Sequence, residues 1–142
     1  MTTTIGRTVL TVRDLEASTA FWSDGFGFRT LFRGDADGFP LLHVGPGGVA
    51  EPGLWLVPLP DGERPLVRPG FPTLVLYVDD VDATIARLAA VGVEPVVAPA
   101  TDPETGDRFA HVLDPDGHRV VVVRLGSVQT PAEPRVAPSS DI

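Results

Sequence analysis

An internal repeat constrains the fold of this chain more than any other feature of its sequence. Residues 7–18 read RTVLTVRDLEAS and residues 73–84 read TLVLYVDDVDAT, and the two segments align without a gap. The aligned pairs are Val9 with Val75, Leu10 with Leu76, Val12 with Val78, Asp14 with Asp80, and Ala17 with Ala83. Such a repeat indicates two copies of one structural unit, which pack together to bury the apolar faces that neither copy can bury alone.

Each copy is predicted to begin with a strand and to continue into a helix. Period-two alternation places Thr8, Leu10 and Val12 on one face of the first strand, and Leu74, Leu76 and Val78 on the matching face of the second. Asp14 and Asp80 then stand where helix N-caps are expected. The helices of about ten residues should end near Gly25 or Gly27 in the first copy and near Gly92 in the second, as glycine C-caps do.

Three short strand-like runs follow each helix. In the first copy they are Arg29–Arg33, Phe39–Val44 and Gly53–Val57, and in the second they are Glu94–Val97, Arg108–Leu113 and Arg119–Arg124. The sequence Asp-Pro-Asp-Gly at 114–117 is a tight turn between the last two. A strand, a helix and three strands give a sheet covered by a helix on one face only, and the open face is where a ligand would bind.

The repeat therefore predicts an α+β fold of two tandem β-α-β-β-β modules whose mixed sheets form a cup. We expect a single domain over residues 1–126, with module one at 5–58, a proline-rich linker at 59–71 and module two at 72–126. Residues 127–142 contain three prolines and few apolar residues, which predicts a disordered tail.

Charge and composition exclude several classes of partner. The chain has 19 acidic and 11 basic residues and no cysteine. Without a basic run it lacks the charge that nucleic-acid binding requires, and an acidic surface disfavours anionic membranes. The absence of cysteine excludes disulfides and thiolate metal sites. With no signal-peptide pattern and no apolar run near the ~20 residues of a membrane span, we expect a cytoplasmic protein.

Three motifs, in order and within the repeat, resemble those of the vicinal oxygen chelate superfamily of glyoxalases, bleomycin resistance proteins and extradiol dioxygenases. They are VRDLEASTAFW at 12–22, VDDVDA at 78–83 and HVLDPDGHRV at 111–120. The likeness spans residues 5–125 and implies two β-α-β-β-β modules around a cupped sheet. In many members of the family this cup holds a divalent metal, bound by the first and fourth strands of each module.

The resemblance also implies where those metal ligands would stand, and here the positions hold Arg7, Trp55, Thr73 and Val121. Arginine stays protonated and cannot bind a metal. Valine and tryptophan offer no suitable lone pair, and a lone threonine hydroxyl is a poor ligand for the ions that such sites hold. We therefore expect no metal and no other cofactor.

The candidate ligand pocket comprises the residues predicted to face the cup, which are Arg7, Val9, Trp55, Thr73, Tyr77, Phe109, His111 and Val121. Arg7 is a candidate for binding an anionic or carbonyl group, although it could equally pair with a carboxylate or reach solvent. Trp55 and Tyr77 could stack on a planar ligand, or they could simply pack in the core or at an interface.

The three histidines are weaker candidates. The alternation of Ala110 and Val112 predicts that His111 faces the cup, where it could act as a general base or as a hydrogen-bond donor. The alternative is an ordinary hydrogen-bonded or exposed histidine. The face of His43 is not fixed by its neighbours, and His118 in the turn is expected to be solvated.

Two functions remain open. The first is a metal-free protein that binds a planar or aromatic metabolite or antibiotic, as the resemblance to bleomycin resistance proteins implies. The alternative is an enzyme of the same fold, such as a lyase, isomerase or dioxygenase, with a relocated metal site or with metal-independent acid/base chemistry. In either case the family implies a homodimer whose cups are completed across the interface.

Overall fold

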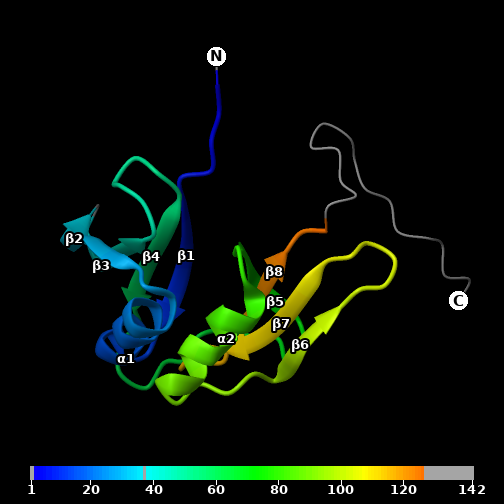
Figure 1. Ribbon diagram of the computed structural model, residues 1–142. Helices are drawn as coiled ribbons and strands as arrows, with labels where there is room; N and C mark the ends of the chain where they lie inside the picture. Colours follow the sequence, from blue (N-terminus) through cyan, green and yellow to red (C-terminus); the bar gives the residue numbers. More distant parts are fainter. Residues whose placement is uncertain (1, 37, 127–142) are drawn as a thin grey trace, which may run out of the picture.

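The computed structural model describes residues 2–36 and 38–126, and it contains the predicted strand, helix and three strands twice (Figure 1). Module one consists of β1 (Arg7–Val12), α1 (Leu15–Ala20) with a π-helical turn η1 (Phe21–Gly25), β2 (Arg29–Ala36), β3 (Phe39–Gly45) and β4 (Gly53–Pro58). Module two consists of β5 (Pro72–Tyr77), α2 (Val81–Ala90), β6 (Val97–Thr101), β7 (Arg108–Leu113) and β8 (Arg119–Arg124).

The two modules have the same strand order. The first sheet is ordered β1-β4-β3-β2 and the second β5-β8-β7-β6. In each sheet the first strand of the module pairs in parallel with its last strand, and the other pairs are antiparallel. The predicted α+β fold of two β-α-β-β-β modules with mixed sheets is confirmed.

Both helices begin where the sequence predicts. The Asp14 carboxylate accepts hydrogen bonds from the backbone N–H groups of Glu16 and Ala17 at 3.0 and 3.2 Å. The Asp80 carboxylate accepts one from the N–H of Ala83 at 3.0 Å. These bonds satisfy donors that have no partner within the first helical turn.

The two modules share one hydrophobic core on their helical sides. Trp22 of η1 and Leu88 of α2 are fully buried. At Gly25 a Cβ atom would lie 2.6 Å from Cδ2 of Leu88, so a larger residue here would have to displace the Leu88 side chain of α2. Across the same junction, Arg87 Nε donates to the backbone oxygen of Asp24 at 3.1 Å, and Arg13 pairs with Asp116 at 2.9 Å.

One strand and one histidine differ from the sequence predictions. The strand expected at Glu94–Val97 runs from Val97 to Thr101. Pro95 has no N–H group for a ladder hydrogen bond, and the pairing with β7 begins only at Val97 and His111. His118 is buried rather than solvated, because its Nδ1 lies 2.7 Å from Oδ2 of Asp114 beneath the 114–117 turn.

Among the described residues, no helix is long and apolar enough to cross a membrane. The predicted cytoplasmic location stays a prediction. The predicted disordered tail at 127–142 lies outside the described residues.

Candidate functional site

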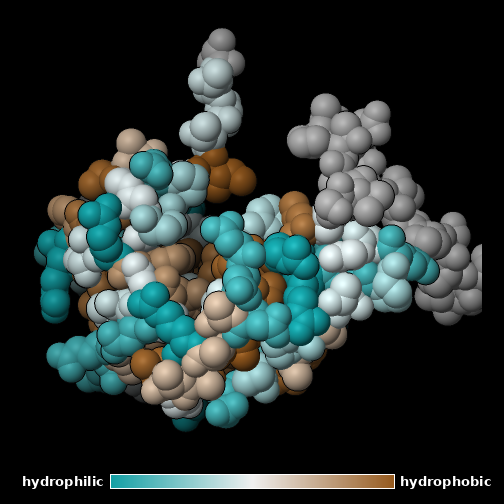
Figure 2. Space-filling model, in the orientation of Figure 1, coloured by the Kyte–Doolittle hydropathy of each residue, from teal (hydrophilic) through white to brown (hydrophobic). Residues whose placement is uncertain are grey.

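The outward face of each sheet, meaning the face opposite the helices and the core, is open and partly apolar. Val9 of β1 is 55% exposed, and Val75 and Tyr77 of β5 are 52% and 73% exposed. Their strand neighbours Leu10 and Val12 are buried in the core. Figure 2 shows hydrophobic side chains at the junction between the two modules, with hydrophilic side chains over most of the rest of the visible surface. The predicted alternation of β1 and β5 is therefore confirmed.

On the outward face of module one, Arg7 and Trp55 lie next to each other. The guanidinium carbon of Arg7 lies 5.6 Å from the centre of the Trp55 ring, and Arg7 Nη2 donates to the backbone oxygen of Val49 at 2.7 Å. Among residues 2–36 and 38–126, no carboxylate forms a salt bridge with Arg7. The arginine is thus held in place by an aromatic ring and a carbonyl, and its charge is not neutralised.

His43 completes this site. A cavity of about 180 Å³ is lined by Arg7, Leu31, Phe32, Leu41, His43, Val49 and Trp55. His43 is only 2% exposed, and its Nε2 atom has no hydrogen-bond partner among the described residues. Burial, together with the nearby charge of Arg7, lowers the pKa of His43 below its ordinary value of 6.5. The imidazole is therefore neutral at neutral pH and retains an unused hydrogen-bonding atom.

Glycine at position 53 makes room for this imidazole. Gly53 is the register partner of Arg7 in the parallel β1–β4 pair. A Cβ atom on Gly53 would lie 2.8 Å from Nε2 of His43 and 2.7 Å from the backbone oxygen of Val44. Any larger residue would displace the histidine or the strand.

The outward face of module two also pairs a histidine with an arginine. Arg119 Nη1 lies 3.0 Å from Nδ1 of His111, and the ring of Phe109 lies 6.2 Å from that of His111. Burial, and secondly the charge of Arg119, lower the pKa of His111 below 6.5. His111 and Phe109 occupy the face that the sequence predicted, because Ala110 and Val112 are buried on the other side.

The contact with Arg119 decides which nitrogen of His111 carries the proton. A guanidinium group can only donate, so Nδ1 of the neutral imidazole must accept and the proton must reside on Nε2. In this tautomer Nε2 is a hydrogen-bond donor and not a base. The arrangement therefore disfavours the general-base role considered for His111.

The two sites occupy equivalent places in the repeat. Trp55 is the register partner of Val9 and His43, and Val121 is the register partner of Val75 and His111. The strand register therefore places Trp55 and Val121 at equivalent positions in the two modules. Because Val9 aligns with Val75, Arg7 corresponds to Thr73 and Gly53 to Arg119. Each module thus carries one arginine at the same end of its parallel strand pair. In module one it lies on the first strand, β1, and in module two it lies on the last strand, β8.

The predicted pocket left out His43, whose face the sequence did not fix, and Arg119, which was not considered. Both modules contain a His-Val pair in the third strand, at 43–44 and 111–112, and aligning these pairs would have placed His43 on the same face as His111. Arg119 lies two residues before Val121, so the period of the strand already placed it on the outward face.

The family's metal does not fit the side chains found here. The positions that correspond to the family's ligands hold a guanidinium, an indole, a hydroxyl and an isopropyl group, and the guanidinium of Arg7 is a fixed positive charge at the site. Among the described residues, the imidazoles and carboxylates close enough together to share an ion are those of Asp114, Asp116 and His118.

That cluster lies at the β7–β8 turn, and most of its hydrogen bonds stabilise the turn, although Oδ2 of Asp116 is buried without a hydrogen-bond partner among the described residues. The Asp114 carboxylate accepts from the N–H groups of Asp116 and His118 at 3.0 and 2.8 Å as well as contacting the His118 ring. The Asp116 carboxylate binds Arg13. We interpret the cluster as a brace for the turn.

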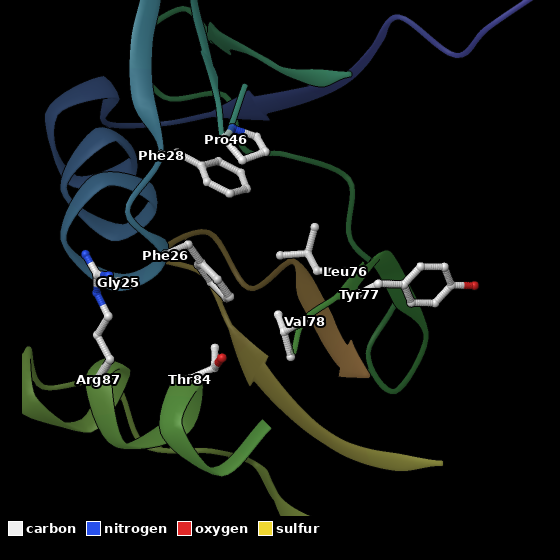
Figure 3. Close-up of a pocket in the computed structure, with 9 residues that line it drawn as sticks. All are labelled: Gly25, Phe26, Phe28, Pro46, Leu76, Tyr77, Val78, Thr84 and Arg87. Carbon is white, nitrogen blue, oxygen red and sulfur yellow. The ribbon is translucent and has the colours of Figure 1, made fainter. Parts of the chain in front are cut away.

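A second cavity of about 290 Å³ lies at the junction of the modules (Figure 3). Phe26, Phe28, Leu76 and Val78 converge on it, whereas Tyr77 points away from it. Its hydrogen-bonding side chains bind backbone oxygens, since Thr84 Oγ1 donates to Asp80 and Arg87 Nε to Asp24. This cavity is less suited to specific recognition than the Arg7 site.

Comparison with known proteins agrees with this architecture. The sequence profile of the Glyoxalase/Bleomycin resistance protein/Dioxygenase superfamily matches residues 4–122, which is most of the chain. The chain belongs to this superfamily. No curated protein matches the chain in sequence.

Solved structures of the superfamily superimpose on most of the chain. TnmS3, an antibiotic binding protein from Streptomyces sp. CB03234, is 28% identical, with a TM-score of 0.72 over 88% of this chain and 98% of that chain. A superfamily member from Sphaerobacter thermophilus DSM 20745 is 25% identical, with a TM-score of 0.71 over 87% and 98%. A glyoxalase I mutant from Zea mays shares the fold at 18% identity, with a TM-score of 0.76 over 87% of this chain and 45% of that chain.

Proposed function

We propose that this protein binds a planar or aromatic small molecule, a metabolite or an antibiotic, without the help of a metal ion. The observation that carries this proposal is the Arg7–His43–Trp55 cavity. It combines an aromatic wall with an arginine that has no salt bridge and an imidazole nitrogen that has no hydrogen-bond partner, as judged over residues 2–36 and 38–126. A buried polar atom left unpaired destabilises a fold, and a ligand bound in the cavity could remove this cost by pairing with Nε2 of His43.

The relatives support a binding role. TnmS3 is described as an antibiotic binding protein, and at 28% identity it resembles this chain over almost its whole length. The side chains at the family's metal positions also favour binding over metal-dependent catalysis, because they offer aromatic and cationic contacts instead of metal ligands.

The size of the cavity further supports a homodimer. Small-molecule sites usually enclose about 300–1,000 Å³, whereas the module-one cavity holds about 180 Å³ and is open to solvent. Exposed apolar side chains, Val9, Val75 and Tyr77 among them, surround the open faces. A second copy that covers these faces would enlarge the pocket and bury them, and sedimentation equilibrium of the purified protein tests this directly.

Tryptophan fluorescence tests the binding proposal. The chain has two tryptophans, and Trp22 is fully buried in the core while Trp55 lines the cavity. A panel of naphthols, quinolines, flavones and anthraquinones should include compounds that quench Trp55 saturably and raise the melting temperature. Chelator treatment should leave the affinity unchanged.

The variant Trp55→Phe serves as the control, because it keeps an aromatic wall but removes the reporter. In this variant the quenching should disappear while the thermal shift persists. If no compound of the panel changes either signal, or if binding is lost after chelation and restored by a divalent ion, the proposal is wrong.

A further inference from the structure

The outward faces differ in charge from the rest of the molecule. The chain has a net charge of −8, with 19 acidic and 11 basic residues. The strands that form the two candidate sites (β1, β3 and β4 in module one, and β5, β7 and β8 in module two) contain no Asp or Glu at any position, inward or outward. They do contain Arg7 and Arg119 with His43 and His111. The outward positions of these strands therefore offer the proposed ligand arginine and histidine side chains but no carboxylate.

The charges that act on His43 and His111 are also consistent with positively charged outward faces. The charged group that acts on His43 is Arg7, and the one that acts on His111 is Arg119. Among the described residues, no carboxylate forms a salt bridge with either arginine. Both faces are therefore locally positive, in spite of the acidic surface elsewhere.

The hydrogen-bonding groups of these faces are mainly donors. Arg119 Nε is buried and has no partner among the described residues. His111 presents its Nε2–H, because Arg119 occupies Nδ1. Arg7 uses one nitrogen for the backbone oxygen of Val49 and retains its other donors. Groups that can only donate require acceptor atoms, and guanidinium groups bind oxyanions most strongly.

We propose that the ligand is a planar organic anion. In module one its ring lies against Trp55 and its carboxylate, sulfonate or phenolate oxygen binds Arg7, with His43 Nε2 as a further polar contact. In module two Arg119 and His111 provide a second acceptor-binding place. This inference rests on the proposed function and names the class of ligand for the same faces. A cationic ligand finds no carboxylate there to bind.

Three probes that share one ring system test the inference. These are 2-naphthoate, its neutral amide 2-naphthamide and the cation 2-naphthylmethylammonium, each titrated by calorimetry into the full chain at pH 7.5 and low salt. We expect naphthoate to bind at least tenfold more tightly than the amide, a difference of about 1.4 kcal/mol, and the cation to bind most weakly. Raising the salt should reduce the preference, because screening weakens attraction to partly exposed arginines.

Charge variants locate the site. Arg7→Gln and Arg119→Gln should each reduce the affinity for naphthoate and leave that for naphthamide almost unchanged. The control is Arg64→Gln, which changes the net charge equally at an exposed linker position. This control should bind all three probes like the original protein.

The outcomes separate the two proposals. Equal affinity for naphthoate and naphthamide, or an equal effect of Arg64→Gln, overturns the anion inference but leaves planar binding intact. Failure of all three probes to bind counts against both. A measurement without ligand provides a further check, since nitrogen-15 NMR should show His111 protonated on Nε2. Protonation on Nδ1 would remove the donor pattern on which the inference depends.

Discussion

Replacing His43 by leucine should make the protein more stable while it weakens ligand binding. The imidazole is 2% exposed, and its Nε2 atom has no partner among the described residues. Leaving a buried polar atom unpaired costs roughly 1–3 kcal/mol, and a leucine of similar volume contacts the neighbouring Leu31 and Leu41 without that cost. We expect His43→Leu to raise the free energy of unfolding by about 1 kcal/mol, or the melting temperature by about 3 °C.

Urea unfolding followed by Trp22 fluorescence measures this change, and His118→Leu is the matched control. His118 is buried to a similar degree, but its Nδ1 contacts Asp114 at 2.7 Å. Its removal leaves the buried Asp114 carboxylate short of a partner, so this variant should lose about 1–3 kcal/mol. The two histidine-to-leucine changes should therefore have opposite signs.

A loss of 1 kcal/mol or more in His43→Leu, with an unchanged denaturant slope, would refute this reasoning. It would mean that Nε2 of His43 already has a hydrogen-bond partner in the folded protein and is not available to a ligand. Unchanged affinity for the best compound of the fluorescence panel in this variant would refute the role of His43 in binding.

Three further predictions follow from the same contacts. The pKa values of His43 and His111 are lowered in the folded state, so the unfolded chain binds more protons, and the free energy of unfolding should fall as the pH drops through 6.5. Urea unfolding at pH 7.5 and at pH 5.5 measures this fall. The variant His43→Leu should show a smaller fall. Gly53→Ala should destabilise by about 1–3 kcal/mol in thermal unfolding and weaken naphthoate binding, because its Cβ would meet His43 and the Val44 carbonyl. Asp80→Ala should lose about 1 kcal/mol in the same assay through loss of the cap on α2, with binding preserved.

The duplicated fold could be predicted from the sequence because several local signals agree with one another. The gapless repeat, the alternation in β1 and β5, and the aspartates at 14 and 80 each indicate the same module. Where a signal was absent, the prediction failed. The bend after Pro95 and the bulge between Val97 and Ala100 shift the register of β6 along β7. The strand propensities of the individual residues do not specify such a shift.

The candidate site was only partly predictable for a related reason. Arg7, Trp55 and His111 alternate with core residues, so their direction could be read from the strand period. His43 lies in an unbroken buried run from Leu41 to Gly45, in which both faces are covered and the period carries no information. The burial of His118 depends on the 114–117 turn, in which the Asp114 carboxylate accepts a hydrogen bond from the backbone N–H of His118. The sequence of the turn does not reveal this contact.

The position of the arginine on different strands in the two modules, Arg7 on β1 and Arg119 on β8, affects the orientation of a bound ligand. The two modules repeat the same order of strands and helix, yet the arginine lies on the first strand (β1) of module one and on the last strand (β8) of module two. Superposition of one module on the other therefore does not bring the guanidinium groups of Arg7 and Arg119 to the same place. A planar anion that binds each face in the same way would therefore place its charged group toward β1 in module one and toward β8 in module two.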